Sequence, residues 1–138
     1  MADVANPQTW TAWARALEPL PAQLSGVVLA SDGAASAAGQ ALLEVLASGE
    51  QLARAGVDVG LVADELRRYQ KFAAPGRPSL QIVQLRRQQS GVQQAQRVAR
   101  QAHIRGADQF ARAIALDVPA KLGVVAAVER WLQAALPG

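Results

Sequence analysis

The sequence has no cysteine and only one histidine, His103. The missing thiols exclude disulfides and cysteine-based metal centres, and a single histidine excludes a His-based metal cluster and a Cys–His pair. A Ser–His–Asp triad would need His103 to act from the middle of a long helix, so a partly buried helical histidine is the better interpretation. No pair of carboxylates stands out for acid–base catalysis. We therefore expect a protein that is not an enzyme, with no catalytic residue, metal or cofactor.

Long apolar runs are also missing. The first ten residues, MADVANPQTW, have neither the basic start nor the apolar core of a signal peptide. No apolar run approaches the ~20 residues that a membrane-spanning helix needs. The sequence thus predicts a soluble cytoplasmic protein with no membrane partner.

Aromatic residues make up only 4% of the chain, whereas hydrophobic residues make up 51%, because alanine dominates the apolar content. That apolar content is too high for a disordered chain. Small side chains let backbones approach closely, which favours helix packed on helix over a sheet sandwich. A length of 138 residues is typical of one domain. We predict an all-α, single-domain bundle of five or six helices that covers residues 1–138.

Proline, glycine and capping residues set the expected helix boundaries. Asn6-Pro7 is typical of an N-cap followed by proline at the first helical position, and a second short helix should follow Pro21. In the leucine-rich segment after it, Gly49 and Gly56 are expected to stop or kink the helix, with Asp58 capping the next one.

The strongest break is APGRP at residues 74–78, which is a candidate hinge. The segment SLQIVQLR after it contains strand-like residues but runs directly into helical periodicity, so helix is favoured. Val118-Pro119 should end the long helix that follows, and the last helix should run from about Pro119 to Leu136.

That long helix, from about Arg86 to Ile114, is the most informative stretch of the chain. At 100° per residue its six arginines fall within an arc of about 140°. These arginines, which we call the arginine face, are Arg86, Arg87, Arg97, Arg100, Arg105 and Arg112. The opposite arc should be apolar and should pack inward. It contains Val92, Ala95, Val98, Ala99, Ala102, Gly106, Phe110 and Ala113.

The arginine face predicts a binding surface for phosphate, because guanidinium groups make forked contacts with phosphate oxygens. It rises about 39 Å along the helix, comparable to one turn of duplex nucleic acid. Gln93, Gln94 and Gln101 would assist as uncharged donors and acceptors. Two alternatives remain: an acidic protein surface, and a face that is solvated or paired with the more acidic residues 1–79. In either binding case the chain would belong to a multi-subunit or homo-oligomeric assembly.

Other features favour structural roles over binding. Trp10, Trp13 and Trp131 could stack on bases, but their helical spacing among Leu and Ala favours the core. The segment GAASAAG, residues 33–39, follows no strand and lacks the Lys-Ser/Thr of a phosphate-binding loop. A helix-turn-helix in residues 108–132 is disfavoured because its second helix carries few polar side chains that could contact bases.

Overall fold

The computed structural model describes residues 2–18, 20–28, 36–73, 76 and 79–137. Its elements in chain order are α1 (Pro7–Arg15), a 3-10 turn η1 (Ala22–Leu24), α2 (Ser25–Val28), α3 (Ala37–Lys71), α4 (Leu80–Ala113) and α5 (Val124–Ala135). The described part of the chain contains helices and connecting turns but no strand, which confirms the all-α prediction. No described helix is long and apolar enough to cross a membrane.

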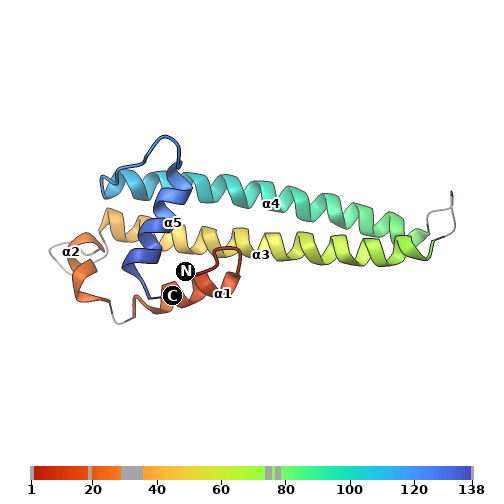
Figure 1. Cartoon of the computed structure of the whole chain (residues 1–138), viewed down its shortest axis with the longest axis horizontal. Helices are drawn as coiled ribbons and strands as arrows, with labels where there is room; N and C mark the ends of the chain where they lie inside the picture. Colours follow the sequence, from red (N-terminus) through yellow and green to blue (C-terminus); the bar gives the residue numbers. More distant parts are fainter. Residues whose placement is uncertain (1, 19, 29–35, 74–75, 77–78, 138) are drawn as a thin grey trace.

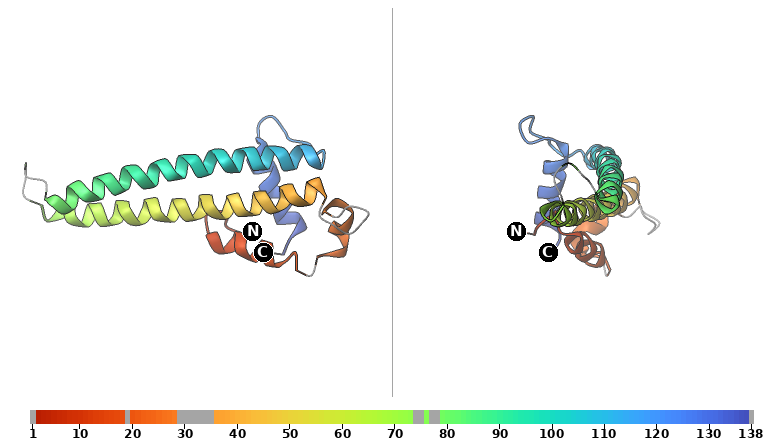
Figure 2. Two further views of the ribbon diagram at one scale, coloured as in Figure 1. Left: turned by 180° about the vertical axis from the view of Figure 1, so that it is seen from behind. Right: turned by 90° about the vertical axis from the view of Figure 1, so that its right-hand side faces the viewer.

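Two long antiparallel helices, α3 and α4, dominate the molecule (Figure 1). The shorter helices α1, α2 and α5 gather at the end of this hairpin that holds the start of α3 and the end of α4, and the other half projects away from them (Figures 1 and 2). We call these two parts the base and the arm. The two chain ends meet at the base, where the Gln133 side chain accepts from the Ala2 amide and donates to the Ala2 carbonyl.

The two long helices meet along a seam whose positions alternate in steps of three and four residues, as in coiled coils. On α3 these buried or half-buried positions are Leu42, Val45, Gly49, Leu52, Gly56, Val59, Ala63 and Leu66. On α4 they are Ile82, Leu85, Gln89, Val92, Gln96, Ala99, His103, Gly106 and Phe110. The main core lies at the base and a small second core, around Leu66, Ile82 and Leu85, lies near the tip of the arm.

The expected breaks at Gly49 and Gly56 are wrong, because α3 runs without interruption from Ala37 to Lys71. Gly49 is needed for a close approach: a Cβ there would lie 2.4 Å from two ring carbons of Trp10. Helical glycine costs about 1 kcal/mol relative to alanine, and pairing with α4 offsets that cost along the helix. Asp58 therefore lies inside α3 and caps no helix.

The core interpretation of Trp10 and Trp13 is confirmed, since they are only 2% and 0% exposed. Their rings meet edge to face with centroids 5.1 Å apart, a favourable aromatic geometry. Trp131 on α5 is half-buried and packs edge to face on Phe110 of α4. The aromatic residues thus fasten α1 and α5 to the base of the hairpin.

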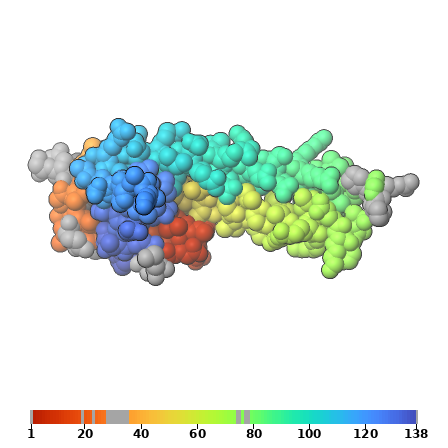
Figure 3. Space-filling view, turned by 45° about the horizontal axis from the view of Figure 1, so that its top comes forward, coloured from red at the N-terminus to blue at the C-terminus, as the bar shows by residue number. Residues whose placement is uncertain are grey.

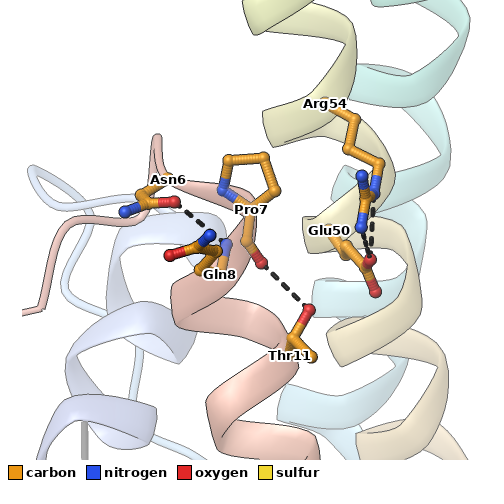
Figure 4. A network of polar contacts seen from close by, with 6 residues as sticks. All are labelled: Asn6, Pro7, Gln8, Thr11, Glu50 and Arg54. Atoms are coloured by element: carbon orange, nitrogen blue, oxygen red, sulfur yellow. Dashed lines mark hydrogen bonds and ion pairs between the residues drawn. The ribbon is translucent and has the colours of Figure 1, made fainter.

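Caps set the beginnings of α1 and α4, and the cap of α1 is the predicted one, whereas α4 begins at Leu80 and not at about Arg86. Asn6 directly precedes Pro7, and its side chain accepts a hydrogen bond from the Gln8 amide (Figure 4). Ser79 caps α4 by accepting from the Ile82 amide, so SLQIVQLR is helical from Leu80 onward.

The end of α4 and the start of α5 differ from the prediction. The helix ends at Ala113, and Ala115 takes a left-handed conformation with φ of 52°. The last helix begins only at Val124, after Gly123 with φ of 85°, and not at Pro119. Two left-handed residues let the chain reverse between α4 and α5, a feature that periodicity does not reveal.

Two expected features lie wholly or partly outside the described residues. Of the candidate hinge only Gly76 is described, with φ of 75°, whereas residues 74–75 and 77–78 are not. Of GAASAAG, residues 33–35 are outside the description. Ser36 is the N-cap of α3 and accepts from the Gly39 amide, so the end of this segment starts a helix.

Candidate nucleic-acid interface

The side chains of the predicted interface are all exposed on α4. They are Arg86, Arg87, Gln93, Gln94, Arg97, Arg100, Gln101, Arg105 and Arg112. They extend from the arm to the base, and the space-filling view shows α4 uncovered by other helices along the arm (Figure 3). At 1.5 Å per residue, the arginines span about 39 Å of a helix about 51 Å long.

Few carboxylates neutralise the arginine face. Among the described residues, Arg112 alone of the six forms an ion pair, at 3.0 Å with Asp108 one turn before it. Arg97 donates instead to the uncharged Gln94 side chain, at 2.8 Å. These contacts leave five guanidinium groups without a carboxylate partner in the described part of the chain.

Two of the five acidic residues of α3 form ion pairs within their own helix. Glu50 pairs with Arg54 at 2.7 Å, and Asp64 pairs with Arg67 (Figure 4 shows the first pair). Both pairs are three or four residues apart and solvent-exposed, where such contacts contribute little stability. The described ion pairs therefore give no support to the alternative in which the N-terminal half neutralises the arginine face.

The predicted apolar face of α4 is wrong in part. Gly106 and Phe110 are buried, and Val92, Ala99 and Ala102 are half-buried, whereas the remaining three members are exposed. These are Ala95, Val98 and Ala113, with Val98 58% exposed. Gln89, Gln96 and His103 lie in the coiled-coil seam instead. The buried side of α4 is therefore rotated about the helix axis toward one edge of the arginine face. Packing against α3 decides which side of α4 is buried, and residue composition alone does not.

A pocket that the sequence did not indicate opens beside the seam at the base. It has a volume of about 500 Å³ and is bounded by the N-terminal segment, α1, α3, α4 and α5. Its polar wall consists of Gln96, Arg100 and His103 on α4 together with Glu129 on α5. We call this site the polar pocket. No local motif could have revealed it, because Glu129 and the α4 residues come together only when α5 folds back on the hairpin.

His103 was predicted to be partly buried, but it is fully buried, with only 1% of its surface exposed. Its Nδ1 lies 2.9 Å from the Ser48 hydroxyl, and its ring packs edge to face on Trp10. Its Nε2 finds no hydrogen-bond partner in the described structure and lies 4.0 Å from Glu129 Oε1. Burial lowers the pKa of His103 and raises the pKa of Glu129, because both lose solvation of their charged forms.

Ser48, His103 and Glu129 have the residue types of a nucleophile, a base and an acid, but not the required geometry. The 4.0 Å gap from Nε2 to Glu129 exceeds a hydrogen bond. Ser48 is also not among the residues that line the polar pocket, so its hydroxyl does not face a place for substrate. Among the described residues, no three His, Asp or Glu side chains cluster closely enough to hold a metal ion.

Comparison of the chain with models of protein families, with curated proteins and with solved structures found no match.

Proposed function

We propose that this chain is a non-catalytic helical subunit that binds the backbone of a nucleic acid through the arginine face of α4. In this proposal the hairpin and the base helices form one bundle, and α4 is its long Gln/Arg-rich amphipathic helix. The subunit would act in the cytoplasm within a multi-subunit or homo-oligomeric assembly. The observation that carries the proposal is the exposure of all six arginines, five of them without a carboxylate partner among the described residues.

Backbone binding fits this surface better than base recognition does. A convex helix with arginines spread over about 140° can contact successive phosphates but presents few side chains that distinguish one base from another. Most of the affinity would then come from the release of counterions. Gln93, Gln94 and Gln101 would add hydrogen bonds to phosphate or sugar oxygens.

The salt dependence of binding tests the proposal. Each phosphate neutralised on duplex DNA adds about 0.9 to the magnitude of the slope of log K against log salt. With four to six arginines engaged, we expect a slope of roughly −3.5 to −5.5 that is nearly independent of base sequence. Fluorescence anisotropy with two labelled 20-base-pair duplexes of different sequence, from 30 to 300 mM KCl, would measure it.

Replacing Arg97 and Arg100 together with Gln should flatten the slope by nearly two, since two phosphate contacts are lost. The matched control replaces Arg15 and Arg54 with Gln, because both are exposed arginines on helices other than α4 and their loss changes the net charge equally. Equal effects of the two double variants, or no binding by the wild-type protein at low salt, would refute the proposal.

A second candidate function is that of an α-helical adaptor whose arginine face contacts an acidic protein surface. The exposure of Val98 and the groove that Val98, Ala95 and Ala102 form with Ala55 of α3 favour it, because an apolar strip beside basic residues suits a protein partner. Val98→Ser should weaken such a protein complex and leave the salt slope for DNA unchanged. An equal loss of DNA binding in Val98→Ser would count against the adaptor.

A further inference from the structure

The polar pocket has an apolar side and a charged side. Val4, Leu52 and Val57 contribute to the apolar wall, which the N-terminal segment, α1 and α3 form. Gln96, Arg100 and His103 follow one another along α4, and Glu129 of α5 joins them. A concave site of a few hundred Å³ with apolar walls and a few polar groups is the usual form of a small-molecule site.

Two opposite charges line this pocket without neutralising each other. The Arg100 and Glu129 side chains form no ion pair with one another, and neither pairs with any other Arg, Lys, Asp or Glu of the described residues. Arg100 and His103 are three residues apart on α4, which separates them by about 4.5 Å along the helix axis. Arg100 of α4 and Glu129 of α5 line the same pocket from different helices, so the cation and the carboxylate can each contact a different end of one small ligand.

The hydrogen bonds of His103 indicate which kind of group its free nitrogen accepts. The Ser48 hydroxyl has one hydrogen and contacts both the Val45 carbonyl, at 3.1 Å, and His103 Nδ1, at 2.9 Å. Both contacts are satisfied when Ser48 donates to the carbonyl and Nδ1–H donates to Ser48. His103 Nε2 is then a bare acceptor, and it lies 4.0 Å from Glu129 Oε1, a second acceptor. A group with several hydrogens, such as an ammonium, satisfies both.

The geometry points to a binding site for a small zwitterion with an apolar side chain, the chemistry of a free apolar α-amino acid. The ligand carboxylate would bind the Arg100 guanidinium, with Gln96 beside it. The ligand ammonium would lie between His103 Nε2 and Glu129. The apolar side chain would rest on Leu52 and Val57. This site is separate from the proposed nucleic-acid function, although the two share Arg100.

The pH dependence of binding follows from the groups that face His103. These are Glu129 from α5 and Arg100 from α4, and the lining residues from α1, α3 and the N-terminal segment include no titratable side chain. Burial lowers the pKa of His103, so its Nε2 is an unprotonated acceptor at neutral pH. Acid protonates both His103 and Glu129, and each protonation removes an acceptor for the ammonium. Affinity should therefore fall as the pH drops below 6.5, the ordinary pKa of histidine.

Three probes that share one apolar body separate the roles of the two charges. L-phenylalanine carries both charged groups, 3-phenylpropanoate lacks the ammonium, and 2-phenylethylamine lacks the carboxylate. Isothermal titration calorimetry on the full chain should show phenylalanine binding at least tenfold more tightly than either partial ligand. Chemical shifts of the Gly49 and Gly56 amides, which line the pocket, should move with phenylalanine.

Matched variants link the binding to the pocket. Arg100→Gln should reduce phenylalanine affinity to that of 2-phenylethylamine, and Glu129→Gln should reduce it to that of 3-phenylpropanoate. Arg105→Gln is the control, because Arg105 is exposed on the same helix but does not line the pocket. It should weaken nucleic-acid binding and leave phenylalanine binding unchanged, which keeps the two proposals separable. No phenylalanine binding below 10 mM, or partial ligands that bind as tightly as phenylalanine, would overturn the inference.

Discussion

The contact between Gly49 of α3 and the Trp10 ring gives the sharpest test of how the base is packed. A Cβ at position 49 would lie 2.4, 2.4 and 2.6 Å from three ring carbons of Trp10. The ring cannot swing away, because it is 2% exposed and its Nε1 donates to the Val4 carbonyl at 2.8 Å. Overpacking of this kind costs about 3 kcal/mol, and alanine regains about 1 kcal/mol of helix propensity. Gly49→Ala should therefore lower the free energy of unfolding by about 2 kcal/mol.

Gly60→Ala on the same helix is the matched control, since no atom of the described residues lies within 4 Å of its added Cβ. It should raise the free energy of unfolding by about 1 kcal/mol, because helical alanine is favoured over glycine. Urea denaturation followed by circular dichroism at 222 nm should separate the two variants by about 3 kcal/mol. In a Trp10→Leu background, Gly49→Ala should lose most of its cost. Equal stabilities of Gly49→Ala and Gly60→Ala would refute the close approach of α1 and α3.

Three further predictions follow from the base and the start of α4. Trp10→Phe should destabilise the protein by about 1 kcal/mol more than Trp13→Phe, because Trp10 loses a hydrogen bond whereas Trp13 Nε1 has no partner among the described residues. Equal losses in urea midpoints would contradict this. Since folding lowers the pKa of His103 below its ordinary value of 6.5, the unfolded chain binds the extra proton. The stability from His103 should thus be complete above pH 6.5 and decline in acid. His103→Asn should be less stable overall but flatter with pH than the wild type between pH 7 and pH 5, and an unchanged slope would count against this assignment. Ser79→Ala should cost about 1 kcal/mol by removing the cap of α4, measured against the exposed control Ser90→Ala.

The sequence alone was enough for the fold class and for the beginnings of α1 and of the short helical segment after Pro21. Scarce aromatics, abundant alanine and helical periodicity are local properties, and they predicted an all-α protein correctly. The Asn6 cap acts on a backbone group two residues away, so its effect is readable from neighbours in the chain. The exposure of the arginine face followed from the same periodicity, because charged side chains stay at the surface unless a partner covers them.

The tertiary structure decided whatever depended on contacts between distant residues. Gly49 was expected to break a helix, but it lies inside α3, where the Trp10 ring of α1 leaves no room for a Cβ. In the α3–α4 seam Gln96 and His103 face inward, whereas Val98 stays exposed. More than one side of α4 carries apolar residues, so packing against α3 decides which side is buried. The polar pocket includes Glu129 of α5, which is 26 positions after His103 in the chain. The periodicity of a single helix cannot predict that these two residues lie side by side.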